Sequence, residues 1–190
     1  SIDYRLSPTS TFPEHIIDYK EGLAWVKTHI HKYGGNPDFI IVTGGSAGGH
    51  LCSLLALTAN DPVFQPGFED IDTQVQGAVP FYGVYDLTDE HKLQKNTAQR
   101  KLFETSVLKI PLVGNSNQYQ AGSPLFRVNS AAPPFLIIHG SKDSLVPVEE
   151  ARMFAAKLKS VSEQPVAFAE ISDAQHAFDM FPSLRSEHVK

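Results

Sequence analysis

The sequence around Ser46 has the residue types and spacing of a nucleophilic serine. Residues 44–49 read Gly-Gly-Ser-Ala-Gly-Gly, which contains the pattern G-x-S-x-G. Between a strand and a helix, this pattern forms a sharp turn that exposes the serine hydroxyl above the sheet. An apolar run at residues 39–43 precedes it, and a leucine-rich helical pattern follows. This context favours a nucleophile over a glycine-rich turn with an ordinary exposed serine.

A nucleophilic serine needs a general base, and the base needs a carboxylate that orients it. In this type of fold the chain order is serine, then acid, then histidine. Asp143 follows an apolar strand pattern at residues 135–138, and His176 follows another at residues 166–171. Because the carboxyl ends of parallel strands meet at one edge of a sheet, three separate loops can deliver Ser46, Asp143 and His176 to one place.

Each of these partners also has an ordinary structural explanation. Asp143 lies in Lys-Asp-Ser, which is common turn material, and an isolated histidine such as His176 is more often a capping or core residue. Asp86 follows the strand pattern at residues 75–82 and is the rival acid, because some hydrolases place the acid one strand earlier. Chain order and loop position together favour Asp143. His139, at the end of a strand pattern, is expected to hydrogen-bond a neighbouring loop.

The elements that must position these residues alternate between strand and helix patterns. Apolar residues recur every three or four positions over residues 14–33, which predicts an amphipathic helix, and Pro147 begins another. Residues 86–130 mix polar and scattered apolar side chains, and we expect them to form helical caps and loops, as in a cap- or lid-like insertion. Strands are predicted at residues 39–43, 75–82, 135–138 and 166–171, with further helices from about residue 47 and after residue 176.

This alternation predicts an α/β fold with a mostly parallel sheet and helices on both faces. The 190 residues are 42% hydrophobic, and 16 basic against 21 acidic residues give a net charge of −5, which disfavours nucleic acid as a partner. No apolar run reaches the roughly 18 residues that cross a membrane, and no histidine pair has zinc-site spacing. The single cysteine cannot form an internal disulfide. The sequence leaves open the cellular location, with the cytoplasm favoured, and whether the chain forms a homo-oligomer.

Further motifs extend over nearly the whole chain. They are D-Y-R-L-S-P at 3–8, F-P at 12–13, W-V at 25–26, G-G-N-P at 34–37, G-S-A-G-G at 45–49, H-G-S-K-D at 139–143, V-P at 146–147 and H-A-F at 176–178. Together they resemble the hormone-sensitive-lipase-like branch of the α/β-hydrolase superfamily, and the later ones are also similar to prolyl-oligopeptidase-like and acetyl-esterase relatives. The resemblance implies an α/β-hydrolase fold with Ser46 as nucleophile, Asp143 as acid and His176 as base, and neither a metal nor an organic cofactor.

Two features depart from that pattern. Gly45 occupies the position before the nucleophile, where the branch usually carries an acidic residue. The branch also has a His-Gly-Gly oxyanion loop, with its strands, in a region before the segment that begins this chain. We therefore expect residues 1–190 to form a single catalytic domain whose N-terminal strands are absent, either as the C-terminal fragment of a larger hydrolase or with those strands supplied by another segment.

The residues and the resemblance predict a serine hydrolase that cleaves small-molecule carboxylic esters with short-to-medium acyl chains through an acyl-enzyme. The backbone N–H of Ala47 is predicted to stabilise the oxyanion. Two alternatives remain: a prolyl-oligopeptidase-like peptidase, and a non-catalytic binding protein on a hydrolase scaffold, which would normally have lost one of the three residues. The residues predicted to bind substrate are Tyr82, Leu145, Val146 and Phe178.

Overall fold

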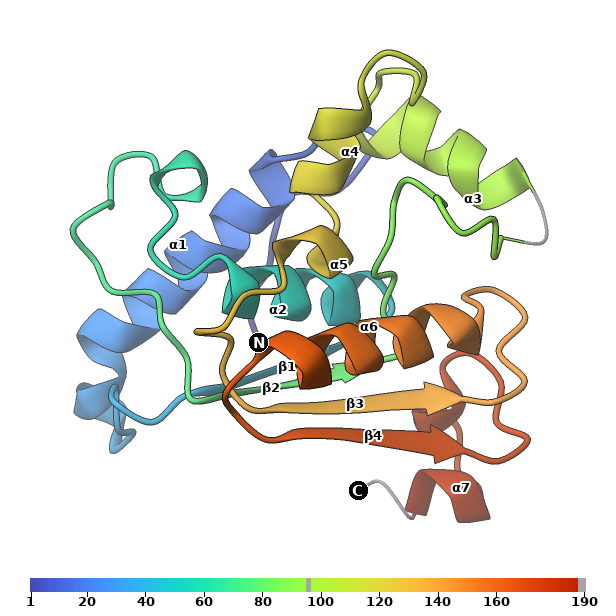
Figure 1. The fold of residues 1–190 in the computed structure, drawn as a ribbon. Helices are drawn as coiled ribbons and strands as arrows, with labels where there is room; N and C mark the ends of the chain where they lie inside the picture. Colours follow the sequence, from blue (N-terminus) through green and yellow to red (C-terminus); the bar gives the residue numbers. More distant parts are fainter. Residues whose placement is uncertain (95–96, 188–190) are drawn as a thin grey trace.

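A parallel sheet forms the centre of the computed structural model, which describes residues 1–94 and 97–187 (Figure 1). In these residues the sheet has four strands in the order β1-β2-β3-β4, and each strand runs parallel to its neighbours. All the carboxyl ends therefore lie at one edge of the sheet. The strands are β1 (Ile41–Gly45), β2 (Gly77–Phe81), β3 (Phe135–Gly140) and β4 (Val166–Ile171).

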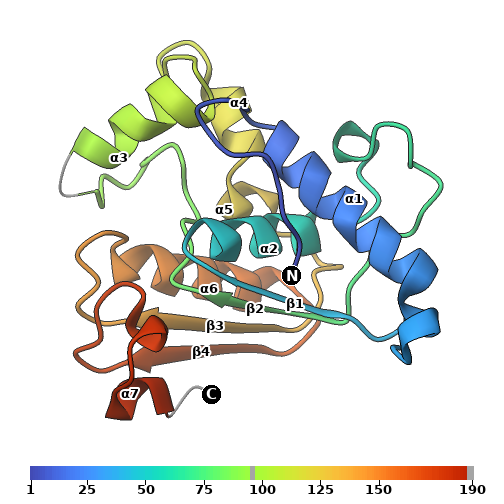
Figure 2. The same cartoon turned by 180° about the vertical axis from the view of Figure 1, so that it is seen from behind.

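The longer helices cover one face of this sheet (Figures 1 and 2). The short helix α7 (Leu184–Glu187) lies on the other side, below β4 in the view of Figure 1. The predicted helix over residues 14–33 is present as α1 with a 3₁₀ turn at its end, Ile30–Tyr33. No helix in the described part of the chain is long and apolar enough to cross a membrane. The helices on the covered face are α1 (Glu14–His29), α2 (Ala47–Leu57), α5 (Pro124–Arg127) and α6 (Val148–Val161).

The main hydrophobic core lies between the sheet and these helices. Leu54 of α2 and Phe154 of α6 are completely buried, and they belong to the same cluster as Ile137 of β3. Side chains alternate between the two faces of a strand. Accordingly, Ile41 and Leu136, which neighbour inward-facing residues, are 52% and 39% exposed on the opposite face. This core packs β1 against α2, the two elements on either side of the predicted nucleophile.

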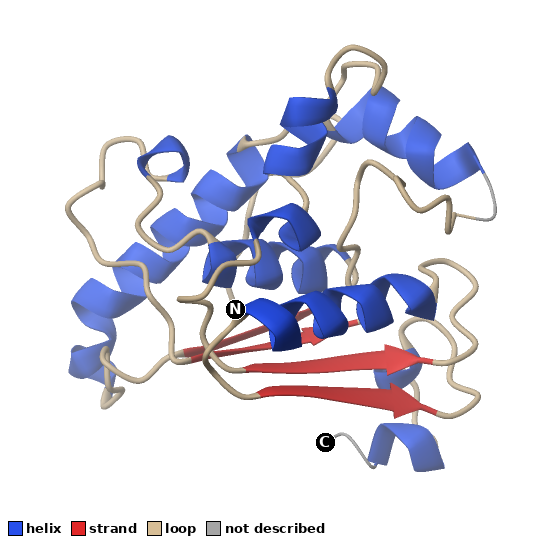
Figure 3. Cartoon of the chain, in the orientation of Figure 1, coloured by secondary structure: helices blue, strands red, loops and turns tan. Residues whose placement is uncertain are grey.

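The segment predicted to form a cap consists of short helices joined by loops, and its described residues contain no strand (Figure 3). Its side chains Phe103 and Tyr119 pack with Leu87 and Leu108 in a small buried cluster separate from the main core. This cluster holds α3 and the turn after it close to the loop that follows β2. The elements are α3 (Thr97–Leu102), a π-helical turn (Phe103–Val107), α4 (Ser116–Ala121) and α5.

Strand β1 begins two residues later than predicted and includes both glycines before the serine. Glycine is depleted in strands, so the apolar run at residues 39–43 dominated the prediction. The pairing extends further because β2 lies alongside, with Gly44 opposite Pro80 and Gly45 opposite Phe81. The sheet therefore continues up to the residue before Ser46.

Candidate active site

Ser46 occupies a strained turn between β1 and α2. Its φ is 56° and its ψ is −117°, a conformation that residues with a side chain rarely adopt. The Ser46 N–H donates a hydrogen bond to the carbonyl of Phe81, with an N···O distance of 3.0 Å. A Cβ on Gly44 would come within 2.6 Å of the backbone of Gly48, so glycine is required where strand and helix approach. This is the geometry that the G-x-S-x-G pattern predicts.

The structure brings Ser46, His176 and Asp143 together in one chain of hydrogen bonds. His176 Nε2 lies 2.9 Å from Ser46 Oγ, and His176 Nδ1 lies 2.7 Å from Asp143 Oδ2. A carboxylate only accepts hydrogen bonds, so we assign the ring proton to Nδ1, which leaves Nε2 free to accept from the serine hydroxyl. Asp143 follows β3 and His176 follows β4, and each therefore reaches the edge where Ser46 lies.

The Asp143 carboxylate is fully buried and saturated with donors. Oδ1 accepts the N–H groups of Leu145 and Val146 at 2.9 and 2.8 Å. Oδ2 faces His176 Nδ1 and, at 3.3 Å, His139 Nε2. Burial by itself would raise the pKa of Asp143, but the hydrogen bonds from both histidines and both amides hold that pKa well below its usual range. Asp143 is therefore an anion throughout the neutral range.

His139 supports the aspartate from the end of β3. It is completely buried, and its Nε2 lies 3.0 Å from the carbonyl of Val146 as well as near Asp143. Its Nδ1 is buried without a hydrogen-bond partner among the described residues, so we assign the ring proton to Nε2. The expected bond to a neighbouring loop is present, and that loop is the one that carries the acid. The sequence feature that indicates the contact between His139 and Asp143 is their spacing of four residues.

The rival acid, Asp86, has a different set of partners. Its Oδ1 accepts the N–H and the hydroxyl of Thr88 at 2.7 and 2.6 Å, and its Oδ2 accepts the N–H of Glu90 at 3.2 Å. These bonds stabilise the turn after β2. The carboxylate that bonds His176 is Asp143, and Asp86 closes a turn.

An apolar cavity of about 490 Å³ opens beside Ser46 and Ala47. Two of the residues predicted to bind substrate, Leu145 and Val146, line it. The Ala47 N–H begins helix α2, where the first N–H groups have no intrahelical acceptor. Residues of the 86–130 segment form much of the cavity wall. This contribution was not predicted from the sequence. The remaining lining residues are His50, Val84, Leu87, Ala98, Gln99, Leu102, Phe103 and Val107.

The other two predicted substrate residues lie elsewhere. Tyr82 and Phe178 are 3% and 7% exposed, and neither is among the described residues that line the cavity. The Tyr82 ring packs against the imidazole of His176, and the Phe178 ring packs edge-on against Tyr82, in a small hydrophobic cluster with Ile138. Each side chain is therefore buried in this cluster and lies outside the cavity wall that the described residues form.

His50 contributes a polar group to the cavity wall. Its Nδ1 lies 2.9 Å from the carbonyl of Val84, which makes Nδ1 the donor. Burial lowers the pKa of His50 to about 4, against a smaller opposing effect of that hydrogen bond. His50 is therefore neutral at pH 7.

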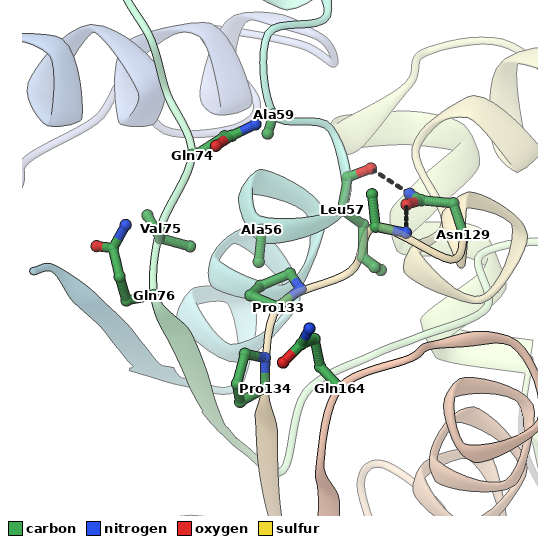
Figure 4. Close-up of a pocket in the computed structure, with 11 residues that line it drawn as sticks. Ala56, Leu57, Ala59, Gln74, Val75, Gln76, Asn129, Pro133, Pro134 and Gln164 are labelled. Atoms are coloured by element: carbon green, nitrogen blue, oxygen red, sulfur yellow. Dashed lines mark hydrogen bonds between the residues drawn. The ribbon is translucent and has the colours of Figure 1, made fainter. Parts of the chain in front are cut away.

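A second cavity, of about 460 Å³, lies at the amino ends of the strands (Figure 4). Side-chain amides surround it, and Asn129 donates to the carbonyl of Leu57 at 3.2 Å. The described residues that line it include neither a nucleophile nor an ionisable side chain. They are Ala56, Leu57, Ala59, Gln74, Val75, Gln76, Asn129, Ala131, Pro133, Pro134 and Gln164. The described walls of this second cavity therefore supply no group for proton transfer.

A parallel sheet with a strained serine turn and a histidine and an aspartate in its later loops defines the α/β-hydrolase class. Residues 1–158 match the BD-FAE family, a range that includes Ser46 and Asp143 and ends before His176. The chain therefore belongs to the BD-FAE family of α/β-hydrolases. This confirms the superfamily that the motifs indicated.

Curated relatives and solved structures agree with this assignment. The chain is 55% identical to the probable carboxylic ester hydrolase LipM and 47% identical to the esterase LipQ, both of Mycobacterium tuberculosis; in each case all of the chain matches 44% of the relative. The chain thus spans less than half the length of these relatives. A truncated carbohydrate esterase from gut microbiota has the same fold, with a TM-score of 0.84 at 20% identity, over 100% of this chain and 70% of that one. An esterase from Thermogutta terrifontis gives a TM-score of 0.71 at 26% identity, over 90% and 57%.

Proposed function

We propose that this chain hydrolyses carboxylic esters through an acyl-enzyme formed on Ser46. The observation that carries the proposal is the continuous series of hydrogen bonds from Ser46 Oγ through His176 to the buried Asp143 carboxylate. A hydroxyl at its ordinary pKa is a weak nucleophile, and a positioned base removes that barrier. Asp143, anionic and fixed by four donors, keeps the imidazole in the tautomer in which Nε2 is the base.

The geometry supports a two-stage reaction. As Ser46 Oγ attacks the ester carbonyl, His176 Nε2 takes the hydroxyl proton, and the carbonyl oxygen becomes an oxyanion that the Ala47 N–H can stabilise. The C–O bond to the alcohol then breaks, and the imidazolium returns its proton to the departing oxygen. Water attacks the acyl-enzyme in the same way, which releases the carboxylic acid and regenerates the serine.

Esters are favoured as substrates by the cavity and by the relatives. The cavity is lined mainly by aliphatic and aromatic side chains and, at about 490 Å³, has the size of a small-ligand site. It therefore suits an apolar acyl group of short to medium length. LipM and LipQ are named as a carboxylic ester hydrolase and an esterase, and a structure of the Thermogutta terrifontis esterase is described as butyrate-bound.

The test is turnover of p-nitrophenyl esters of increasing acyl length by the whole protein and by its Ser46→Ala variant. Loss of the nucleophile should lower kcat by at least about 10⁴-fold, while the melting temperature stays close to that of the unsubstituted protein. Ser160→Ala is the matched control, because that serine lies on the exposed side of α6 and, among the described residues, its hydroxyl bonds the carbonyl of Lys157 in its own helix. Its activity should be unchanged.

A proline-containing amide assayed in parallel separates the alternatives. Preferred cleavage of the amide would indicate a peptidase, and turnover of neither substrate would indicate a binding protein. Ester turnover that persists in Ser46→Ala would refute the proposed nucleophile. A fluorophosphonate probe gives an independent measurement, since it should add one equivalent to Ser46 and none to the Ser46→Ala protein.

A further inference from the structure

We propose that Tyr82 and Asp179 form a positioning pair that holds the imidazole of His176 during catalysis, an inference that rests on the function proposed above. Tyr82 follows β2, and Asp179 lies three residues beyond His176, in a short 3₁₀ helix (Phe178–Met180) that follows β4. The pair therefore connects the loop that carries the base to a different strand of the sheet.

Tyr82 is fixed in place before it meets the histidine. Its backbone N–H donates to the carbonyl of Ile138 at 2.8 Å, and its φ is 37°, in the left-handed region that a tyrosine rarely adopts. Its side chain is almost fully buried. The ring centroid lies 4.7 Å from that of His176 at an interplanar angle of 59°. Rotation of the imidazole toward the sheet is blocked by this ring.

The tyrosine hydroxyl provides the second contact. It donates to Asp179 Oδ1 at an O···O distance of 2.5 Å, within the range of a charge-assisted bond. Burial, and then the hydrogen bond to Asp179, raises the pKa of Tyr82, so the phenol remains protonated and remains a donor. The turn from His176 to Asp179 is thus held at both ends by one side chain, with ring contact at one end and a hydrogen bond at the other.

The same hydroxyl explains the glycine before the nucleophile. A Cβ on Gly45 would lie 2.7 Å from the Tyr82 hydroxyl and 3.0 Å from its ring, so a larger residue there would displace the tyrosine. The hormone-sensitive-lipase-like branch usually has an acidic side chain at this position. In this chain the Tyr82 side chain fills that space, and its hydroxyl bonds the carboxylate of Asp179 instead.

This arrangement predicts an effect on turnover and none on substrate binding. His176 must pass a proton between Ser46 and the leaving oxygen, and errors of about 1 Å in such geometry lower rates up to about 100-fold. Tyr82 does not line the cavity within the described residues. Loss of the pair should therefore lower kcat and leave KM unchanged.

The experiment is a double-mutant cycle in the whole protein, with kcat and KM measured on p-nitrophenyl butyrate. Tyr82→Phe and Asp179→Ala should each lower kcat by about tenfold, the effect expected for one lost hydrogen bond to a charged group. The double variant should be no slower than either single variant, because both remove the same bond. Asp179→Asn should retain kcat within about threefold, since its amide oxygen still accepts the phenol proton.

Tyr19→Phe is the matched control. It also removes a hydrogen-bonded hydroxyl, here one bonded to the carbonyl of Thr43 in β1, and it should leave kcat unchanged. Asp179 is only half-buried, so the two aspartate variants provide the test even if Tyr82→Phe unfolds. A Tyr82→Phe variant with normal kcat, a change confined to KM, or additive losses in the double variant would overturn the pair. Failure of the proposed function is distinct, because ester turnover would then not depend on Ser46.

Discussion

Asparagine at position 143 should abolish most of the activity and leave the fold largely intact. In the structure Oδ1 of Asp143 accepts two backbone N–H groups and Oδ2 accepts two imidazole N–H groups. An asparagine that keeps the first two bonds places its NH₂ group against His176 and His139, so that donors face donors. His176 then moves its proton to Nε2, the atom that must accept from Ser46.

The two consequences differ greatly in size. Loss of the correct tautomer lowers kcat by about 10⁴ in serine proteases, and we expect a similar factor here. Stability should change much less. His176 can change tautomer, and His139 Nε2 retains the carbonyl of Val146 as an acceptor at 3.0 Å. One weakened buried hydrogen bond corresponds to about 1–3 kcal/mol of unfolding free energy.

The assay is steady-state hydrolysis of p-nitrophenyl butyrate together with urea unfolding of the same preparations. Asp86→Asn is the matched control, because an asparagine there can keep the Oδ1 bonds to Thr88. It should lower the unfolding free energy by about 1–3 kcal/mol, because its NH₂ group meets the N–H of Glu90 that Oδ2 accepts in the unsubstituted protein, and it should leave kcat nearly unchanged. If Asp143→Asn keeps more than a few per cent of the activity, or if Asp86→Asn loses as much, the assignment of the acid is wrong.

Two further predictions concern the buried carboxyl of α6 and the cavity wall. Burial raises the pKa of Glu150 to about 8, against the opposing hydrogen bonds from the backbone N–H groups of Tyr85 and Asp86. This folded-state pKa lies above the unfolded value of about 4.3. The favourable contribution of Glu150 to the free energy of unfolding is therefore complete below about pH 4.3 and is lost as the pH rises to 8. Glu150→Gln should therefore gain stability relative to the unsubstituted protein between pH 5 and pH 8, and equal urea midpoint differences at the two pH values would contradict this. Leu102, 51% exposed on the cavity wall, contributes apolar surface worth about 1 kcal/mol, so Leu102→Ala should raise KM for hexanoate esters about fivefold with little change for acetate. Val113→Ala, at an 80% exposed position outside the cavity lining, should change neither value.

Local sequence signals predicted the main strands and helices, and they indicated that Ser46, Asp143 and His176 lie at the same edge of the sheet. Glycines at fixed positions around Ser46, between a strand pattern and a helix pattern, favour a sharp turn that exposes the serine, and apolar periodicity distinguishes strands from helices within a short window. A parallel sheet brings successive strand ends to one edge, so the chain order of serine, acid and histidine already places Asp143 and His176 near the nucleophile. These properties depend on spacing along the chain, which the sequence contains directly.

The direction of each side chain at that edge was decided by tertiary packing. Asp86 and Asp143 both follow strands, and only the folded loops show that the first closes a turn and the second meets His176. Tyr82 and Phe178 also follow strands, as Leu145 and Val146 do, but their rings are buried together in the cluster with Ile138, whereas the other two line the cavity. The bond between Tyr82 and Asp179 joins residues 97 positions apart, and its existence depends on the relative placement of β2 and the loop after β4. Sequence spacing does not encode such distances, because they are set jointly by strand register, helix packing and the loops between them.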